Sequence, residues 1–157
     1  MPTLVRDGEI TEDEWTYGVE HGSSPQIRAI LDMEDFVKHA HRESLGVCLD
    51  GSVEIEDVID QVKQAALIAV HFAAFADGRG LSLAVLLRSR YDYEGELRAI
   101  GEVLPDWTPY MLRSGFNSFE LADPSAAASA IACMERLTDQ YQASVIQPNP
   151  IFRRPSS

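Results

Sequence analysis

The chain has 157 residues, of which 45% are hydrophobic and 24% charged, and its formal net charge is −12. This length fits one domain that can bury a core without metals or disulfides. The acidic balance argues against nucleic-acid binding, because a phosphate backbone needs a basic protein face. No apolar run approaches the ~20 residues that span a bilayer. The polar start does not resemble a signal peptide, so we expect a cytoplasmic protein without membrane partners.

The first 25 residues predict a β-hairpin followed by an acidic arm. Two short apolar-polar runs within residues 3–11 flank Asp7-Gly8, and this dipeptide suits the two positive-φ positions of a type I′ turn. The arm, Glu12 to Glu20, carries Trp15 and Tyr17 as anchors. We place both features in a single domain over residues 1–146, followed by an extended or mobile tail over residues 147–157.

After the arm, apolar runs alternate with helical patterns, which predicts an α/β fold with a mostly parallel sheet. About five βα units fit either a doubly wound sheet or an incomplete barrel with sequential strands. An open sheet has unpaired edges, so we expect a homodimer. The expected strands are 27–31, 45–49, 67–72, 97–103 and 116–121, and the expected helices are 33–40, 53–65, 81–91, 106–115 and 124–141. We expect Asp32, Asp106 and Asp123 to cap helices and Gly115 to end one.

The strongest candidate site is the loop Asp77-Gly78-Arg79-Gly80, which follows a predicted strand and opens a predicted helix. Ligands of parallel α/β sheets bind at the carboxyl ends of strands. Two glycines allow close backbone approach, and free amides at a helix start favour an anion. The loop is neither a Walker A loop nor a dinucleotide fingerprint. The alternative is an ordinary turn, with Asp77 or Ser82 as the helix cap.

Residues 66–121 contain five arginines and no lysine. Arginine suits fixed contacts with carboxylate, phosphate or sulfur oxyanions, although pairing with neighbouring acids is an equally simple explanation. We expect Arg98 and Asp106 to complete a cleft with Asp77 and Arg79.

Acidic residues also follow several predicted strands: Asp50, Asp77, Glu102 and Glu120. Such carboxylates can hold Mg²⁺, but they also serve as caps and turn residues. His71 lies within an apolar strand, where we expect a hydrogen-bonded core residue.

Cysteine usage predicts no redox centre. Cys48 and Cys133 lie far apart in apolar patterns, so we expect buried free thiols, without a disulfide or metal role.

Three stretches together resemble a known bacterial family. They are Phe75-x-Asp77-Gly78-Arg79-Gly80-x-Ser82-x-Ala84-x-Leu86-Leu87-Arg88, then Gly95-Glu96-Leu97-Arg98-Ala99-x-Gly101-x-Val103-Leu104-x-Asp106, and Arg113-x-Gly115-Phe116-x-x-Phe119. The family is domain of unknown function 934, whose members are often described as oxidoreductases of sulfite reduction because their genes neighbour sulfite reductase. The resemblance implies a process, namely sulfate assimilation, and no established catalytic residues. The chain shows no flavin, nicotinamide, haem or iron–sulfur motif, so we expect no cofactor.

Three hypotheses follow. In the first, the chain is an accessory protein of sulfite or sulfate reduction that binds a small anion or docks on the sulfite reductase machinery. In the second, it is an enzyme with a strand-end carboxylate and arginine site, with or without a divalent metal. In the third, it is a structural interaction protein whose acidic N-terminal third meets a partner.

Overall fold

The structure, a computed structural model, describes residues 2–18, 28–73 and 78–138. Asp77 and the expected tail at 147–157 lie outside these ranges.

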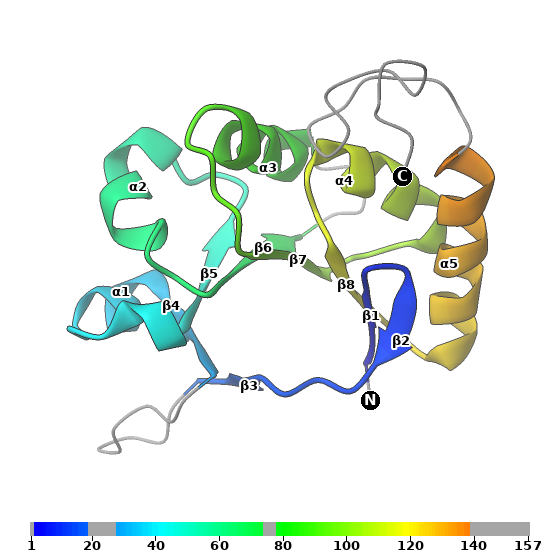
Figure 1. The fold of residues 1–157 in the computed structure, drawn as a ribbon, viewed down its shortest axis with the longest axis horizontal. Coiled ribbons are helices and arrows are strands. Elements are labelled where there is room, and N and C mark those ends of the chain that lie inside the picture. Colours follow the sequence, from blue (N-terminus) through cyan, green and yellow to red (C-terminus); the bar gives the residue numbers. More distant parts are fainter. Residues whose placement is uncertain (1, 19–27, 74–77, 139–157) are drawn as a thin grey trace, which may run out of the picture.

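Eight strands form one curled, mostly parallel sheet (Figure 1). From β3 to β8 the strands lie in sequence order, and each pairs in parallel with the next. The β1–β2 hairpin adds two antiparallel strands beside β8. The strands are β1 Thr3–Arg6, β2 Glu9–Thr11, β3 Thr16–Tyr17, β4 Ala29–Asp32, β5 Gly46–Asp50, β6 Leu67–Phe72, β7 Glu96–Gly101 and β8 Ser118–Leu121.

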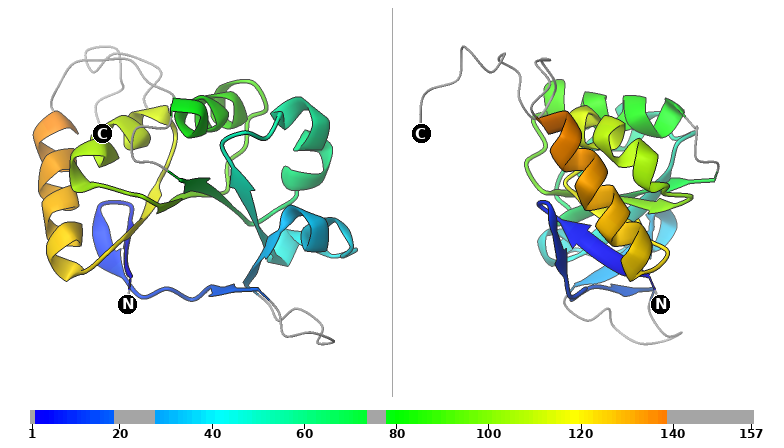
Figure 2. Two further views of the ribbon diagram at one scale, coloured as in Figure 1. Left: turned by 180° about the vertical axis from the view of Figure 1, so that it is seen from behind. Right: turned by 90° about the vertical axis from the view of Figure 1, so that its right-hand side faces the viewer.

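The helices all cover the convex face of the sheet, while its concave face turns inward (Figures 1 and 2). Sequential strands joined by crossovers of one hand place every helix on the same side. The arrangement is therefore an incomplete barrel, and the doubly wound alternative is wrong. The helices are α1 Met33–Val37, η1 Arg42–Ser44, α2 Ile55–Val62, α3 Gly78–Ser89, η2 Pro105–Trp107, α4 Thr108–Ser114 and α5 Pro124–Thr138.

Strand alternation divides the buried side chains into two groups. On β6, Ile68 and Val70 belong to the large core between the sheet and the helices. Leu67 and Ala69 instead point to the concave face, which we call the inner face, where a smaller apolar cluster lies. The same period of two places Cys48 and Arg98 on the inner face, because they pair in register with Ala69.

The expectation of five βα units with an N-terminal hairpin fits only roughly. The hairpin turns at Asp7 and Gly8, which both have positive φ. However, β3 was not expected, because two residues carry no periodicity and this strand exists only through pairing with β4. Helix α3 begins at Gly78, three residues earlier than predicted.

Capping followed prediction at two of three aspartates. The carboxylates of Asp32 and Asp123 accept hydrogen bonds from the amides three residues later, both at 2.8 Å. Asp106 does not cap a helix: it lies inside η2, and α4 starts after Trp107 without a side-chain cap bond. Gly115 ends α4 with a φ of 129°, as predicted.

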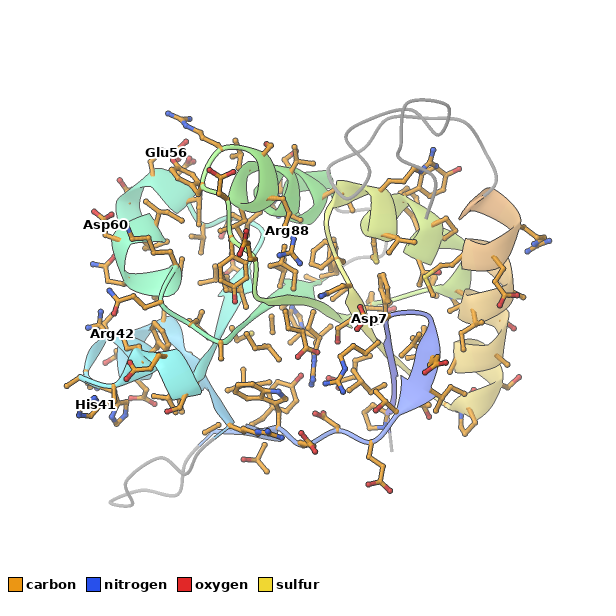
Figure 3. All side chains as sticks on the ribbon, viewed as in Figure 1. Asp7, His41, Arg42, Glu56, Asp60 and Arg88 are labelled. Atoms are coloured by element: carbon orange, nitrogen blue, oxygen red, sulfur yellow. The ribbon has the colours of Figure 1, made fainter. Side chains whose placement is uncertain are left out.

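Residues 12–17 follow β2 and include β3, and they cross the open side of the curl; we call this segment the strap (Figure 1). Trp15 joins the inner-face cluster. A Cβ on Gly46 would lie 3.0 Å from Ile30 and 3.3 Å from the Trp15 ring, so glycine lets the indole lie close to the sheet. The strap thus closes the incomplete barrel with its own side chains, and Figure 3 shows side chains filling the space between the strap and the sheet. The expectation that Trp15 anchors the arm is confirmed.

Candidate functional site

Polar groups gather at the carboxyl ends of β5 and β6, where a site was expected; we call this region the carboxyl edge. Asp50 ends β5 and pairs in register with His71 of β6. The Asp50 carboxylate accepts bonds from the Ser52 hydroxyl and, at 2.8 Å, from the Ser52 amide. These bonds, and then the nearby charges of Arg79 and His71, lower the pKa of Asp50. Arg79 and His71 therefore both lie near enough to act electrostatically on Asp50.

His71 is exposed, so the prediction of a core histidine is wrong. The remaining residues of β6 are all buried, but His71 points to the inner face near the open end of the curl. A Cβ on Gly101 would lie 3.1 Å from Nε2 of His71 and 2.4 Å from the Phe72 carbonyl oxygen. Gly101 also has a φ of 87°. Glycine at this position thus lets the imidazole lie against the end of β7.

The described part of the predicted loop belongs to the first turns of α3. Gly78, Arg79 and Ser82 are exposed, and Gly80 is buried. A Cβ on Gly80 would lie 2.5 Å from the Phe72 ring, so this glycine allows α3 to pack closely on β6. The first turn of α3 contains no acidic residue, which leaves the positive end of the helix dipole beside Arg79.

Arg98 lies away from this loop, at the centre of the inner face, and is fully buried. Its Nη1 donates to Oδ2 of Asp13 in the strap at 2.9 Å, and Nη2 donates to Oε1 of Glu96 at 3.3 Å. Burial opposes the positive charge, but the two carboxylates outweigh it and the pKa of Arg98 is raised. Arg6 approaches the other oxygen of Glu96 at 4.0 Å.

The strap makes a second polar contact with the inner face. The Tyr17 hydroxyl donates to Oε2 of Glu120 on β8 at 2.6 Å. Burial and this carboxylate raise the pKa of Tyr17. Sequence reasoning recognised Tyr17 as an anchor but not its partner, since 103 residues separate the two. The alternation of the strap could have indicated this contact, because the side chains of Asp13, Trp15 and Tyr17, at every second position, all reach the inner face.

Asp106 has different partners in the helical layer. It accepts a bond from the Cys133 thiol at 3.7 Å, and Arg136 donates to the same sulfur at 3.2 Å. The structure therefore does not bring Asp106 to Arg98, whose contacts lie on the inner face. Arg79 acts electrostatically on Asp50, and Asp77 lies outside the described residues.

The sequence did not reveal that Arg88 holds several backbone segments together. Its Nε donates to the Gly115 carbonyl at 2.9 Å, and Nη1 donates to the carbonyls of Tyr93 and Gly95 at 2.7 and 2.8 Å. Figure 3 shows Arg88 on the side of α3 that faces the sheet. Its guanidinium also lies over the Tyr93 ring, 5.7 Å from the centroid. Arg88 thus joins α3 to two loops.

Both cysteines are free, as expected; Cys133 is buried and Cys48 is partly buried. Burial and neighbouring carboxylates raise the pKa of Cys48, so this thiol is a poor nucleophile. Within residues 2–18, 28–73 and 78–138, no group of three or more histidine, cysteine, aspartate or glutamate side chains could hold a metal ion. No helix in the same ranges is long and apolar enough to cross a membrane.

The chain matches a known protein family over its middle and C-terminal part. The model of a family described as bacterial protein of unknown function, DUF934, matches residues 46–152. No curated protein matches the chain. The matched region covers the carboxyl edge, Arg98 and Arg88, and leaves out the hairpin and the strap. The match spans more than half of the sequence, and the chain therefore belongs to the DUF934 family of bacterial proteins of unknown function.

Proposed function

We propose that the chain binds a small oxyanion of the sulfite or sulfate class at the carboxyl edge, as an accessory protein of sulfate or sulfite assimilation. One observation carries the proposal: Asp50 at the end of β5 pairs in register with His71 on the neighbouring strand β6, and Arg79 on α3 acts electrostatically on the same carboxylate. All three side chains are exposed, so a solute can reach them.

The chemistry of this edge favours an oxyanion. The Arg79 guanidinium offers planar paired donors, and the exposed His71 ring offers an N–H. The start of α3 adds the positive end of a helix dipole without an acidic side chain in its first turn. Arg79 acts electrostatically on the Asp50 carboxylate, and a bound oxyanion would share or replace that interaction.

The assignment to sulfate or sulfite assimilation rests on the family resemblance described above, which associates such chains with sulfite reduction. The proposal therefore includes contact with sulfite reductase machinery. It also includes a cytoplasmic location and a homodimer. The dimer would use the outer edge of the sheet at β2, where Ile10 is 53% exposed. Light scattering coupled to size exclusion gives the oligomeric state directly.

Thermal unfolding with sulfite, sulfate or adenylyl sulfate tests the anion site, with chloride at equal ionic strength as the reference. A ligand at 100 times its Kd stabilises a protein by about 2.7 kcal/mol, a shift of several degrees. Arg79→Ala should remove the shift. Arg90→Ala is the matched control, because Arg90 follows the opposite end of α3 and pairs with Glu56 at 3.5 Å. Absence of stabilisation by all three anions, with no reductase partner in a pull-down, would contradict the proposal.

A further inference from the structure

The Asp13–Arg98 contact is an unusual closure for a curled sheet. Arg98 is fully buried in the middle of β7, whereas the side chain of Asp13 keeps 31% of its surface exposed. The partly exposed carboxylate of the strap therefore pairs with an arginine that is buried on the inner face of the sheet. Of the two charged groups, the Asp13 carboxylate is the one in contact with solvent.

Arg98 also has unused hydrogen-bonding capacity. Among the described residues, its Nε has no partner, and neither does the hydroxyl of Ser118. Both residues are fully buried. They are register partners on β7 and β8, so their side chains lie next to each other on the inner face. Buried donors without acceptors are costly, so the pair favours a further acceptor oxygen.

We propose that the inner face holds a second anion site, centred on Arg98 and Ser118, in which the strap residue Asp13 is the built-in occupant. A small anion competes with the Asp13 carboxylate for this site, and it enters when the strap moves away. The site goes beyond the proposed function, which concerns the exposed carboxyl edge and Arg79.

The surrounding charges define the ligand class. Glu96 lies beside Arg98 and is shared with Arg6, and Glu120 is the acceptor for Tyr17. Two glutamates thus already line the inner face, so a dianion would be repelled. A monoanion of carboxylate size replaces the Asp13 side chain charge for charge. Formate and acetate are the simplest probes of this class.

The contacts of the strap are few enough for it to be displaced. Strand β3 has two residues, which pair only with Ala29 and Ile30 in register. Beyond this pairing, the inward contacts of the strap among the described residues are the Asp13 ion pair, the Trp15 ring, and the Tyr17 hydroxyl, which interacts with both Glu120 and Arg98. Moving the strap would expose the Trp15 indole, which provides a spectroscopic signal.

Chemical rescue tests the site. Asp13→Ala leaves Arg98 buried beside empty volume, so the variant should unfold at a lower temperature than the wild type. Formate should then raise the Tm of this variant by about 3 °C or more over chloride at equal ionic strength. Glu14→Ala is the control, because Glu14 is the next residue and pairs with the exposed Arg28. Formate should give that variant no gain over chloride. Equal rescue of both variants, or of neither, overturns the proposal.

Two further variants assign the site to Arg98. In Asp13→Ala/Arg98→Met, formate should have no effect, because an apolar side chain replaces the cation. In Asp13→Ala/Arg79→Ala, formate rescue should persist, since Arg79 belongs to the carboxyl edge. Loss of rescue in the Arg79 double variant would place the anion at the edge and overturn the proposal. Asp13→Asn replaces Asp13→Ala in the same tests if the alanine variant does not fold.

Competition by the strap can be measured in a Trp107→Phe protein, where Trp15 is the remaining tryptophan. Saturating formate should shift the Trp15 emission to the red as the indole leaves the inner face. In this Trp107→Phe protein, the additional Asp13→Asn change should tighten formate binding at least ~10-fold, because the competing carboxylate is gone. This is a difference of about 1.4 kcal/mol in binding free energy. Equal affinity in the two proteins would show that Asp13 does not occupy the site.

Discussion

The side chain of Arg88 lies against Gly115, and its Nε donates to the Gly115 carbonyl at 2.9 Å. A Cβ on Gly115 would come within 2.6 Å of Cγ of Arg88. The absence of a side chain at Gly115, at the end of α4, therefore makes room for Arg88, and Arg88 in turn bonds the Gly115 carbonyl. Both residues belong to the pattern that resembles the family, and in this structure both are explained by packing rather than by a ligand.

Gly115→Ala should destabilise the fold by about 2–3 kcal/mol, because the new methyl group meets Arg88 and the φ of 129° strains an alanine. Urea unfolding at neutral pH measures the change. Gly8→Ala is the control, since Gly8 also has a positive φ of 83° but has nothing within 4 Å of a new Cβ. Gly8→Ala should cost less. Equal costs would mean that contact with Arg88 contributes nothing.

Arg88→Lys should destabilise by about 2–4 kcal/mol, because an ammonium group cannot reproduce three guanidinium bonds to separate carbonyls. Urea unfolding again gives the value. Arg90→Ala, which removes an exposed ion pair with Glu56, should change stability by less than about 1 kcal/mol. A lysine variant as stable as the wild type would contradict the role of Arg88 as a link between α3 and its neighbouring loops.

Gly80→Ala should destabilise by about 1–3 kcal/mol, since the added methyl group would lie 2.5 Å from the Phe72 ring. Gly78→Ala provides a matched control two residues earlier in α3, where nothing lies within 4 Å. Because Gly78 is the first residue of α3, that change should stabilise the helix by less than the ~0.5–1 kcal/mol gained in a helix interior. A double-mutant cycle with Phe72→Leu should show coupling, because the smaller side chain makes room for the methyl group. Additive effects would rule out contact with Phe72 as the cause.

Asp50→Asn should reduce stability at neutral pH, and the difference from the wild type should disappear in acid. The pKa of Asp50 is lowered by the Ser52 hydroxyl and amide and by nearby positive charge. A lowered folded-state pKa stabilises the protein above the unfolded value of about 3.9, and this contribution is lost as the pH falls through the folded pKa. Urea unfolding of both proteins at pH 7 and at several pH values below 4 measures the difference in their free energy of unfolding. A difference that is independent of pH would show that ionisation of Asp50 is not involved.

Local patterns determined much of the framework. The apolar run Leu67–Phe72 forms a strand with the predicted bounds, because a chain buried on both faces carries its own signal. Asp32 and Asp123 cap helices as predicted, since capping needs only an acceptor three residues before a free amide. The Asp7-Gly8 turn depends on two adjacent positive-φ positions, which the dipeptide itself favours.

The chemistry of the inner face could not be derived in this way. His71 and Arg98 both lie in apolar strands, yet one is exposed and the other is fully buried. The curvature of the sheet decides this, because it opens the carboxyl edge near His71 while the strap covers Arg98.

The sequence by itself determined every described strand except β3, the caps at Asp32 and Asp123, and the family resemblance. Only the tertiary structure decided which polar residues meet. Asp13 and Arg98 are 85 residues apart, and they pair because a two-residue strand closes the barrel and brings the strap across it. Asp106, which sequence reasoning grouped with Arg98, instead contacts Cys133 on α5. Local propensity specifies elements, whereas side-chain partners across a sheet depend on its order and curl, which arise from packing of the whole chain.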